Sequence, residues 1–206
     1  MDELQNLSNI LAAEAQAIAS VPLTTNYSAA LDLIQHQVCT LGGKVVASGM
    51  GKAGQIASNI ASTFASTGIP AVCINPAEAQ HGDLGVLQPN DVMLLISNSG
   101  RTDEILRLYE IARMLYPDIR AIVITAEPSS PLAQTPDSIG IFTGNPAEVC
   151  PLGLTPTTSI TAMTVIGHLL IVGMMLRTGF TREQYAVRHQ GGSLGEKLRN
   201  CCNPAK

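Results

Sequence analysis

The sequence predicts an α/β fold in which a doubly wound, mostly parallel five-stranded sheet is flanked by helices. Short apolar runs of buried-strand type alternate along the chain with longer segments of helical spacing, as in sheets covered on both faces. Hydrophobic residues make up 46% of the 206 residues, enough for one domain with a full core. In such folds ligands bind beyond the carboxyl ends of the strands.

The individual elements follow from apolar spacing and from the residues that interrupt it. Two N-terminal helices are expected, at Leu4–Ala19, ended by Pro22, and at about 28–41, ended by Gly42-Gly43. The remaining elements in chain order are a strand from Lys44, a helix at 53–66, a strand at 71–74, a loop at 75–89, a strand at 91–96, a helix at about 103–115, a strand at 120–125, a short helix beginning at 130–133, a strand at 138–142 and a helix at about 157–178. We expect one domain over residues 1–206, with 1–41 as an N-terminal helical segment.

Composition limits the partners of the chain. Charged residues make up only 14%, which indicates surface hidden in an oligomer or, alternatively, a large alanine-rich core. The net charge of −4 and the absence of a basic face in residues 1–40 argue against a nucleic-acid partner.

Three features of the sequence indicate the cellular location of the protein: the N-terminus, the longest apolar run and the cysteines. Met1-Asp2-Glu3 is acidic rather than basic, so no signal peptide is expected, and the run at 169–176 is too short to span a bilayer. The five cysteines show no metal-ligand spacing, which favours reduced thiols. We expect a cytoplasmic protein without a membrane partner.

The most informative segment is the polar loop that follows the strand at 91–96. Ser97, Ser99 and Thr102 place three hydroxyls within six residues, Gly100 lets the backbone approach a ligand closely, and helical spacing resumes from Asp103. One hydroxyl would suffice to cap a helix. Three of them before a helix N-terminus, with its free N–H groups and positive dipole end, favour an anion such as phosphate.

A second strand–loop–helix unit, Ser48 to Lys52, ends at the same edge of the predicted sheet. Gly-x-Gly after a strand is common, and Lys52 alone is also typical of a solvated helix start. Because a lysine there opposes the helix dipole, a ligand contact is the better explanation. His81 with Glu78, and His189, lie in glycine-bearing loop segments that suit either surface residues or a site.

Several motifs together resemble one known family. Ser97–Thr102 looks like the phosphosugar loop of the sugar isomerase (SIS) domain, a flavodoxin-like fold. The segments that resemble its D-arabinose 5-phosphate isomerase branch (KpsF/GutQ-like) are 49–52, 65–68, 81–85, 150–157 and 189–195, in consistent order from about residue 40 to 198. Members often carry two CBS domains after the isomerase domain, and this chain ends where those would start, so we expect a single SIS domain without them. Gln190 replaces a usual proline, and Arg101 often aligns with an acidic residue.

The resemblance implies an aldose–ketose isomerase that interconverts D-arabinose 5-phosphate and D-ribulose 5-phosphate through an enediol, feeding Kdo biosynthesis for lipopolysaccharide or capsule. That chemistry needs a phosphate clamp and acid/base groups near C1 and C2, and needs no metal or cofactor. By resemblance the phosphate would be bound by Ser48, Ser97, Ser99 and Thr102. The catalytic set would be His189, His81, Glu104, Glu148, Lys52 and Glu78.

The resemblance also implies a homotetramer whose pocket is shared between subunits, with His81 a candidate for the cross-subunit role. Feedback by CMP-Kdo, the activated end product, is a further hypothesis that rests only on the missing CBS pair. Two alternatives stay open: another phosphosugar isomerase, of the sedoheptulose 7-phosphate or hexulose 6-phosphate type, and a non-enzymatic phosphosugar-sensing SIS module. A sensor would not require several carboxylates and two histidines around the sugar.

Overall fold

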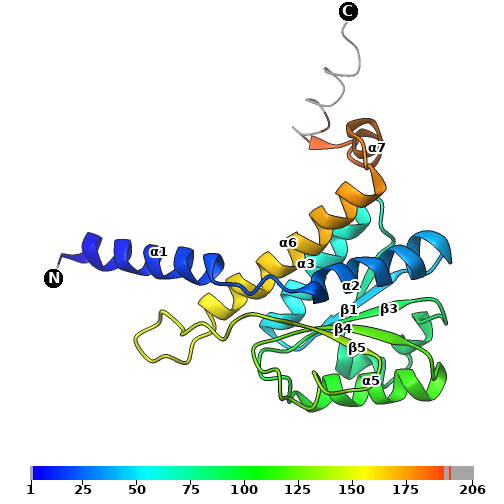
Figure 1. The fold of residues 1–206 in the computed structure, drawn as a ribbon, viewed down its shortest axis with the longest axis horizontal. Coiled ribbons are helices and arrows are strands. Elements are labelled where there is room, and N and C mark those ends of the chain that lie inside the picture. The colour runs from blue at the N-terminus through cyan, green and yellow to red at the C-terminus, as the bar shows by residue number, and fades with distance from the viewer. Residues whose placement is uncertain (1, 193–194, 196–206) are drawn as a thin grey trace, which may run out of the picture.

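A computed structural model describes residues 2–192 and 195 and shows a five-stranded sheet with helices on both faces (Figure 1). The predicted fold class is confirmed. In chain order the elements are α1 (Glu3–Ala19), α2 (Thr25–Ile34), a π-helical turn η1 (Gln35–Thr40), β1 (Val45–Gly49), α3 (Lys52–Ser66), β2 (Ala71–Ile74), α4 (Pro76–Ala79), a 3₁₀ turn η2 (Asp83–Val86), β3 (Val92–Ile96), α5 (Asp103–Leu115), β4 (Arg120–Thr125), β5 (Ser138–Phe142), α6 (Thr158–Thr178) and α7 (Arg182–Arg188).

All neighbouring strands run parallel, in the order β2-β1-β3-β4-β5. This order reverses between β1 and β3, which is the topological switch point where such sheets bind ligands. The register pairs Gly49 at the end of β1 with Ile96 at the end of β3. The two polar loops predicted from the sequence therefore start side by side.

Successive residues of each strand point to opposite faces of the sheet and build two cores. Ala47 and Leu94 pack in the core beneath α2, α3 and α6, whereas Val46 and Met93 pack in the core beneath α5. Every residue of β1 and β3 is buried. This covering on both faces explains why the central strands are continuous apolar runs rather than alternating ones.

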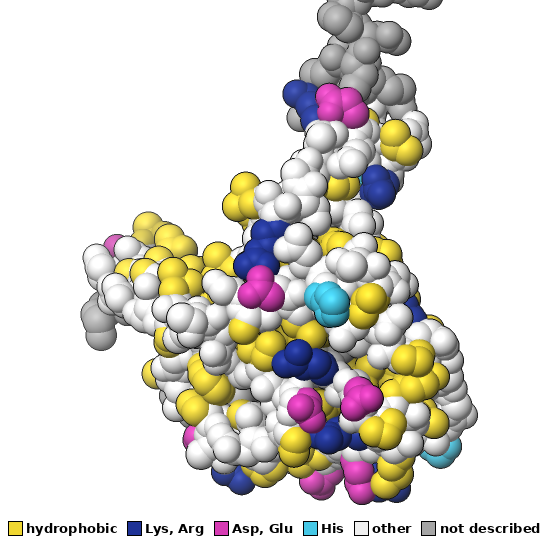
Figure 2. Space-filling view, turned by 45° about the vertical axis from the view of Figure 1, so that its right-hand side comes forward, with side chains coloured by type: hydrophobic (Ala, Val, Ile, Leu, Met, Phe, Trp, Pro, Cys, Tyr) yellow, Lys and Arg dark blue, Asp and Glu magenta, His cyan; other side chains and the backbone are white. Residues whose placement is uncertain are grey.

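The N-terminal helix α1 has no buried residue and projects from the body (Figure 1). Its exposed apolar side chains include Leu4, Leu7 and Leu11, at 72%, 55% and 72% exposure. Hydrophobic side chains cover much of the projecting arm at the left of Figure 2. The second helix begins three residues earlier than predicted, after the Thr24 cap, and its last turn is π-helical.

Three local predictions differ from the structure. The short helix expected from 130–133 is wrong: the segment forms turns, since Pro136 stops a helix from continuing, and its Leu132 amide donates to the Gly100 carbonyl of another loop. The expected loop at 75–89 contains α4 and η2. Helix α7 was not predicted, although Thr181 and Gln184 form a capping box that is visible as Thr-x-x-Gln.

Helix α6 is long and apolar enough, by length and composition, to cross a membrane. A helix that is hydrophobic all round is also typical of a protein core. α6 packs against α3, α1 and α2, and nine of its residues, from Thr158 to Met174, are buried. Its apolar character therefore fits a central core helix.

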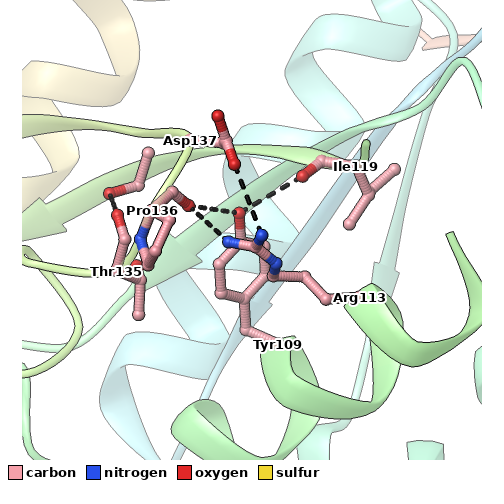
Figure 3. A network of polar contacts seen from close by, with 7 residues as sticks. Tyr109, Arg113, Ile119, Thr135, Pro136 and Asp137 are labelled. Atoms are coloured by element: carbon pink, nitrogen blue, oxygen red, sulfur yellow. Dashed lines mark hydrogen bonds and ion pairs between the residues drawn. The ribbon is translucent and has the colours of Figure 1, made fainter. Parts of the chain in front are cut away.

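A polar network holds α5 against the β4–β5 connection (Figure 3). The Tyr109 hydroxyl lies 3.3 Å from the carbonyl oxygens of both Ile119 and Pro136. Arg113 donates to the Pro136 carbonyl at 2.9 Å and pairs with Asp137 at 3.4 Å. Because α5 starts at the predicted phosphate loop, this network helps to set the position of that loop.

Candidate active site

A cavity of about 360 Å³ lies at the switch point, beyond the carboxyl ends of β1 and β3. This size is in the range of small-molecule sites. Its walls come from three elements: the start of α3, the loop between β3 and α5, and the start of α6. The lining residues are Met50, Lys52, Ala53, Ile96, Ser97, Asn98, Ser99, Thr102, Pro156, Ser159, Ile160 and Met163.

The first wall depends on close approach between the end of β1 and the start of α3. A Cβ on Gly49 would lie 2.5 Å from the Ala53 carbonyl carbon, and one on Gly54 would lie 2.7 Å from the Gly49 oxygen. Gly51 has φ +58° and ends the loop just before Lys52, the first residue of α3. Glycine at these positions lets the helix start directly over the sheet edge, with the exposed Lys52 side chain at the cavity.

The second wall is the predicted phosphate loop, and its three hydroxyls differ in role. Ser97 Oγ and Thr102 Oγ1 hydrogen bond to each other at 2.8 Å, and the Gly100 amide donates to Ser97 Oγ at 3.1 Å. These two side chains therefore hold the loop closed. Ser99 is exposed, and its hydroxyl accepts only from the Arg101 amide at 3.2 Å among the residues described. It is the hydroxyl most available to a ligand.

Backbone donors add to this wall. The amides of Thr102, Asp103 and Glu104 donate to no acceptor in the described part of the chain. They lie at the N-terminus of the 13-residue helix α5, where the helix dipole places partial positive charge. Open amides, a free hydroxyl and a nearby lysine are together a suitable cradle for a phosphate.

The third wall is the start of α6, and Glu148 caps it. Glu148 Oε2 accepts from the Thr157 amide at 2.7 Å, from Thr157 Oγ1 at 2.8 Å and from the Ser159 amide at 3.4 Å. Burial opposes the charged form, but the hydrogen-bonding groups of Ser159 and Thr157 that face the carboxylate outweigh it and lower the pKa of Glu148. Glu148 is therefore an anion at neutral pH.

Cys150 organises the turn that leads into this third wall. Its Sγ accepts from the amides of Leu154 at 3.3 Å and Thr155 at 3.1 Å. The Thr155 hydroxyl and then the amides of Thr155, Leu154 and Leu152 stabilise the thiolate and lower the pKa of Cys150 to about 7. Burial instead raises the pKa of Cys39 and Cys73.

We expect Cys150 to react with iodoacetamide at pH 7 roughly tenfold faster than Cys39 or Cys73, because about half of it is thiolate there. Peptide-resolved mass spectrometry over pH 5–10 measures the rates, and the midpoint for Cys150 should lie near pH 7. Thr155→Val should move that midpoint upward. A Cys150 midpoint no lower than that of Cys39 would contradict the arrangement.

The structure places four of the ten predicted site residues at the cavity: Lys52, Ser97, Ser99 and Thr102. Ser48 does not line it: its side chain is fully buried in β1, and its hydroxyl donates to the Ile74 carbonyl at 2.9 Å. Glu104 is half-buried in the first turn of α5, next to the phosphate loop but outside the lining set. Glu148 reaches the cavity wall only through Thr157 and Ser159.

Glu78 and His81 lie beyond the end of β2, at the same edge of the sheet as the cavity but not in its lining. His189 follows α7, at the far end of α6 from the cavity (Figure 1). At 1.5 Å per residue, the stretch of α6 from Met163 to Thr178 separates them by roughly 20 Å. Within one chain, His189 is not brought to the cavity.

Sequence reasoning missed the contribution of α6. Ser159, Ile160 and Met163 line the cavity, with Pro156 before them. The hydroxyl run Thr157-Thr158-Ser159 before an apolar helix was the available signal, because it repeats the pattern of the phosphate loop. Among residues 2–192 and 195, no group of three or more His, Cys, Asp or Glu side chains is placed to hold a metal ion.

Comparisons with known proteins agree with this geometry. Residues 42–173 match the model of the SIS domain. An arabinose 5-phosphate isomerase KdsD from Yersinia pestis is 48% identical over 76% of this chain, which spans 47% of the length of that relative. A Bacteroides fragilis structure, described as a putative phosphosugar isomerase involved in capsule formation, superimposes with a TM-score of 0.91 at 55% identity, covering 93% of this chain and 99% of that one.

A further structure, of an E. coli CFT073 protein in complex with arabinose 5-phosphate, has a TM-score of 0.82 at 32% identity, and covers 92% of this chain and 100% of that one. The chain thus spans about half the length of the curated relatives but nearly the full length of each of these two solved chains. From the fold, the cavity at its switch point and these matches, the chain belongs to the SIS domain family.

Proposed function

We propose that this chain is an aldose–ketose isomerase that interconverts D-arabinose 5-phosphate and D-ribulose 5-phosphate. The observation that carries the proposal is the cavity between the Ser97–Thr102 loop, Lys52 and the start of α6, which offers a phosphate cradle at one wall and further polar groups at another. Relatives named arabinose 5-phosphate isomerase are 42–48% identical, and the complex with arabinose 5-phosphate is of a chain with this fold.

In the proposed mechanism the phosphate is held by Ser99, the open amides at the start of α5 and Lys52, while Ser97 and Thr102 keep the loop closed. The proton on C2 of the aldose moves to a base, which leaves an enediolate. A proton moves from the C2 hydroxyl to the C1 oxygen, and a proton is delivered to C1 to give the ketose. Lys52 supplies positive charge to the phosphate or to the developing enediolate. The acid/base groups are drawn from His189, His81, Glu104, Glu148 and Glu78.

Oligomerisation is part of the proposal, because His189 lies too far from the cavity of its own chain. A second copy would bring His189, and His81 is a further candidate, to a pocket shared between subunits, within a homotetramer. The exposed apolar side chains of α1 (Leu4, Leu7, Leu11) and of α6 (Val172, Leu176) provide surface for such contacts. On the face shown in Figure 2 positive and negative side chains are intermixed, which fits a small-molecule substrate better than a nucleic acid.

A coupled assay tests the function directly. The purified chain is offered D-arabinose 5-phosphate, D-ribulose 5-phosphate, sedoheptulose 7-phosphate and hexulose 6-phosphate. We expect turnover of the first two, in both directions, without added metal. Turnover of only one of the others would reassign the isomerase, and sugar-phosphate binding without any turnover would favour the sensing module.

Replacing Ser99 by alanine should raise KM about tenfold with little change in kcat. A phosphate contact is present in the ground state and in the transition state alike, so its loss weakens binding uniformly. Ser66→Ala, which removes a helical hydroxyl that donates to the Thr63 carbonyl, is the matched control. A fall in kcat at unchanged KM would contradict a phosphate-binding role for Ser99.

The cellular location, the pathway and the regulation of the protein are proposed on the same grounds. The SIS domain, with residues 1–41 as its N-terminal helical segment, would carry the activity in the cytoplasm. The product would feed Kdo for lipopolysaccharide or capsule. Feedback by CMP-Kdo would act on this domain itself. Calorimetry that detects no binding of CMP-Kdo to the chain would contradict this feedback.

A further inference from the structure

One wall of the cavity carries a buried hydroxyl without a hydrogen-bond partner. Ser159 is 2% exposed, and among the described residues nothing bonds to its Oγ. Such a group costs free energy in the folded state, so its retention calls for an explanation. Three other buried polar atoms lack partners in the described residues, on Glu14, Tyr27 and Gln37, but none of these residues lines this cavity.

The neighbouring hydroxyls of α6 and its cap are all used within the protein. Thr157 Oγ1 donates to Glu148, Thr158 Oγ1 to Glu14, Thr161 Oγ1 to the Thr157 carbonyl, and Thr164 Oγ1 to the Ile160 carbonyl. The capping of α6 needs the Ser159 amide but not its hydroxyl. The Ser159 side chain faces the Glu148 carboxylate closely enough to lower the pKa of Glu148, but its geometry falls short of a hydrogen bond. The free hydroxyl is therefore not explained by helix capping.

The polar groups of the cavity fall into two separate sets. Lys52 and the Ser97–Thr102 loop occupy the walls formed by the strand ends, whereas Ser159 lies among Pro156, Ile160 and Met163 on the α6 wall. A phosphate held by the first set leaves the carbon chain of the ligand to face α6. A sugar hydroxyl both donates and accepts, as does a serine hydroxyl, so the two can pair in either direction.

We propose that Ser159 is a specificity-determining residue that hydrogen bonds a hydroxyl of the sugar chain of the bound phosphosugar. The inference deepens the proposed function and rests on it for the substrate class. A buried polar group that is unpaired without ligand discriminates against ligands that cannot satisfy it. The α6 wall would thus recognise the sugar, whereas the Ser97–Thr102 loop recognises the phosphate.

The test separates sugar recognition from phosphate recognition. Calorimetry measures the binding of D-arabinose 5-phosphate and of inorganic phosphate to wild type, Ser159→Ala and Ser99→Ala. We expect Ser159→Ala to weaken arabinose 5-phosphate binding about tenfold and to leave phosphate binding unchanged, whereas Ser99→Ala weakens both.

Two further variants keep the result interpretable. Thr164→Ala removes a paired hydroxyl from the same helix, away from the cavity, and should change neither affinity. Ser159→Cys, which is nearly isosteric with a weaker donor, should fall between wild type and Ser159→Ala. Unchanged arabinose 5-phosphate binding in Ser159→Ala, or an equal loss of both ligands, would overturn the proposal.

Failure of the proposed function would look different. A wild-type chain that binds arabinose 5-phosphate but does not turn it over would refute the isomerase, while the affinity ratio in Ser159→Ala would still support or refute sugar recognition. A wild-type chain that binds no arabinose 5-phosphate would overturn both.

Discussion

Replacing His189 by alanine is expected to lower kcat by on the order of 10³-fold while the chain stays folded and oligomeric. His189 Nδ1 lies 3.0 Å from the Tyr185 carbonyl, which can only accept, so Nδ1 carries the proton and Nε2 is left free as an acceptor. The ring stacks on Tyr185 at 3.8 Å with an interplanar angle of 16°. An imidazole held in one tautomer and orientation is suited to proton transfer.

The same variant tests whether the pocket is shared. Lys52 lies at the cavity of its own chain, whereas His189 lies roughly 20 Å along α6 from it. If His189 acts in a neighbouring subunit, co-expression of His189→Ala with Lys52→Ala gives mixed oligomers that contain intact pockets and regain activity. A co-expressed pair that stays as inactive as either variant would show that the two residues act within one chain. Near wild-type turnover by His189→Ala alone would remove His189 from the mechanism.

The second large effect is expected from Gly100→Ala. Gly100 has φ +60°, and a Cβ there would collide with the Ser130 side chain. Strain and overpacking together should lower the free energy of unfolding by about 2–4 kcal/mol. For a chain of this size the thermal midpoint then falls by roughly 5–15 °C. Because the Gly100 amide and carbonyl bond to Ser97 and Leu132, phosphate binding should be lost as well.

Two controls separate the effect of backbone strain at Gly100 from the effect of the collision with Ser130. Gly179→Ala carries a similar φ of +61° with no atom within 4 Å of the added Cβ, and it should cost only about 1 kcal/mol. Gly100→Ala combined with Ser130→Gly removes the collision and should recover part of both the stability and the phosphate affinity. A Gly100→Ala variant as stable as Gly179→Ala, with phosphate binding intact, would contradict the packing derived for this loop. Calorimetry and thermal unfolding measure both quantities.

How well an element of the fold could be predicted depended on whether the residues that determine it are neighbours in the sequence. The strands at 91–96 and 120–125 agree with β3 and β4 to within one residue, because a buried parallel strand is marked by its own apolar run. The helix expected from 130–133 did not form: Pro136 stops a helix from continuing, and the segment forms turns that bond to Gly100, about thirty residues earlier in the chain. Helix α7 was overlooked although its capping box is local.

The candidate site divides in the same way. The loop from Ser97 to Thr102 was recognised from hydroxyl content and a following helix, and the structure places its hydroxyls at the cavity. Which hydroxyl remains free for a ligand was not predictable, since the Ser97–Thr102 hydrogen bond depends on the path of the loop. Ser48 looked equivalent to the others in the sequence, but its strand position points the hydroxyl to β2.

The amino-acid sequence by itself determined the parallel α/β fold, the phosphate loop and the resemblance to sugar isomerases, because apolar periodicity, glycine placement and short motifs are properties of neighbouring residues. Only the tertiary structure decided that β1 and β3 lie adjacent, that the start of α6 with Ser159 closes the cavity, and that His189 lies far from the cavity of its own chain. The physical reason is that these relations join residues tens of positions apart. Strand order and helix packing set them through the burial of whole faces, which no single stretch of sequence encodes.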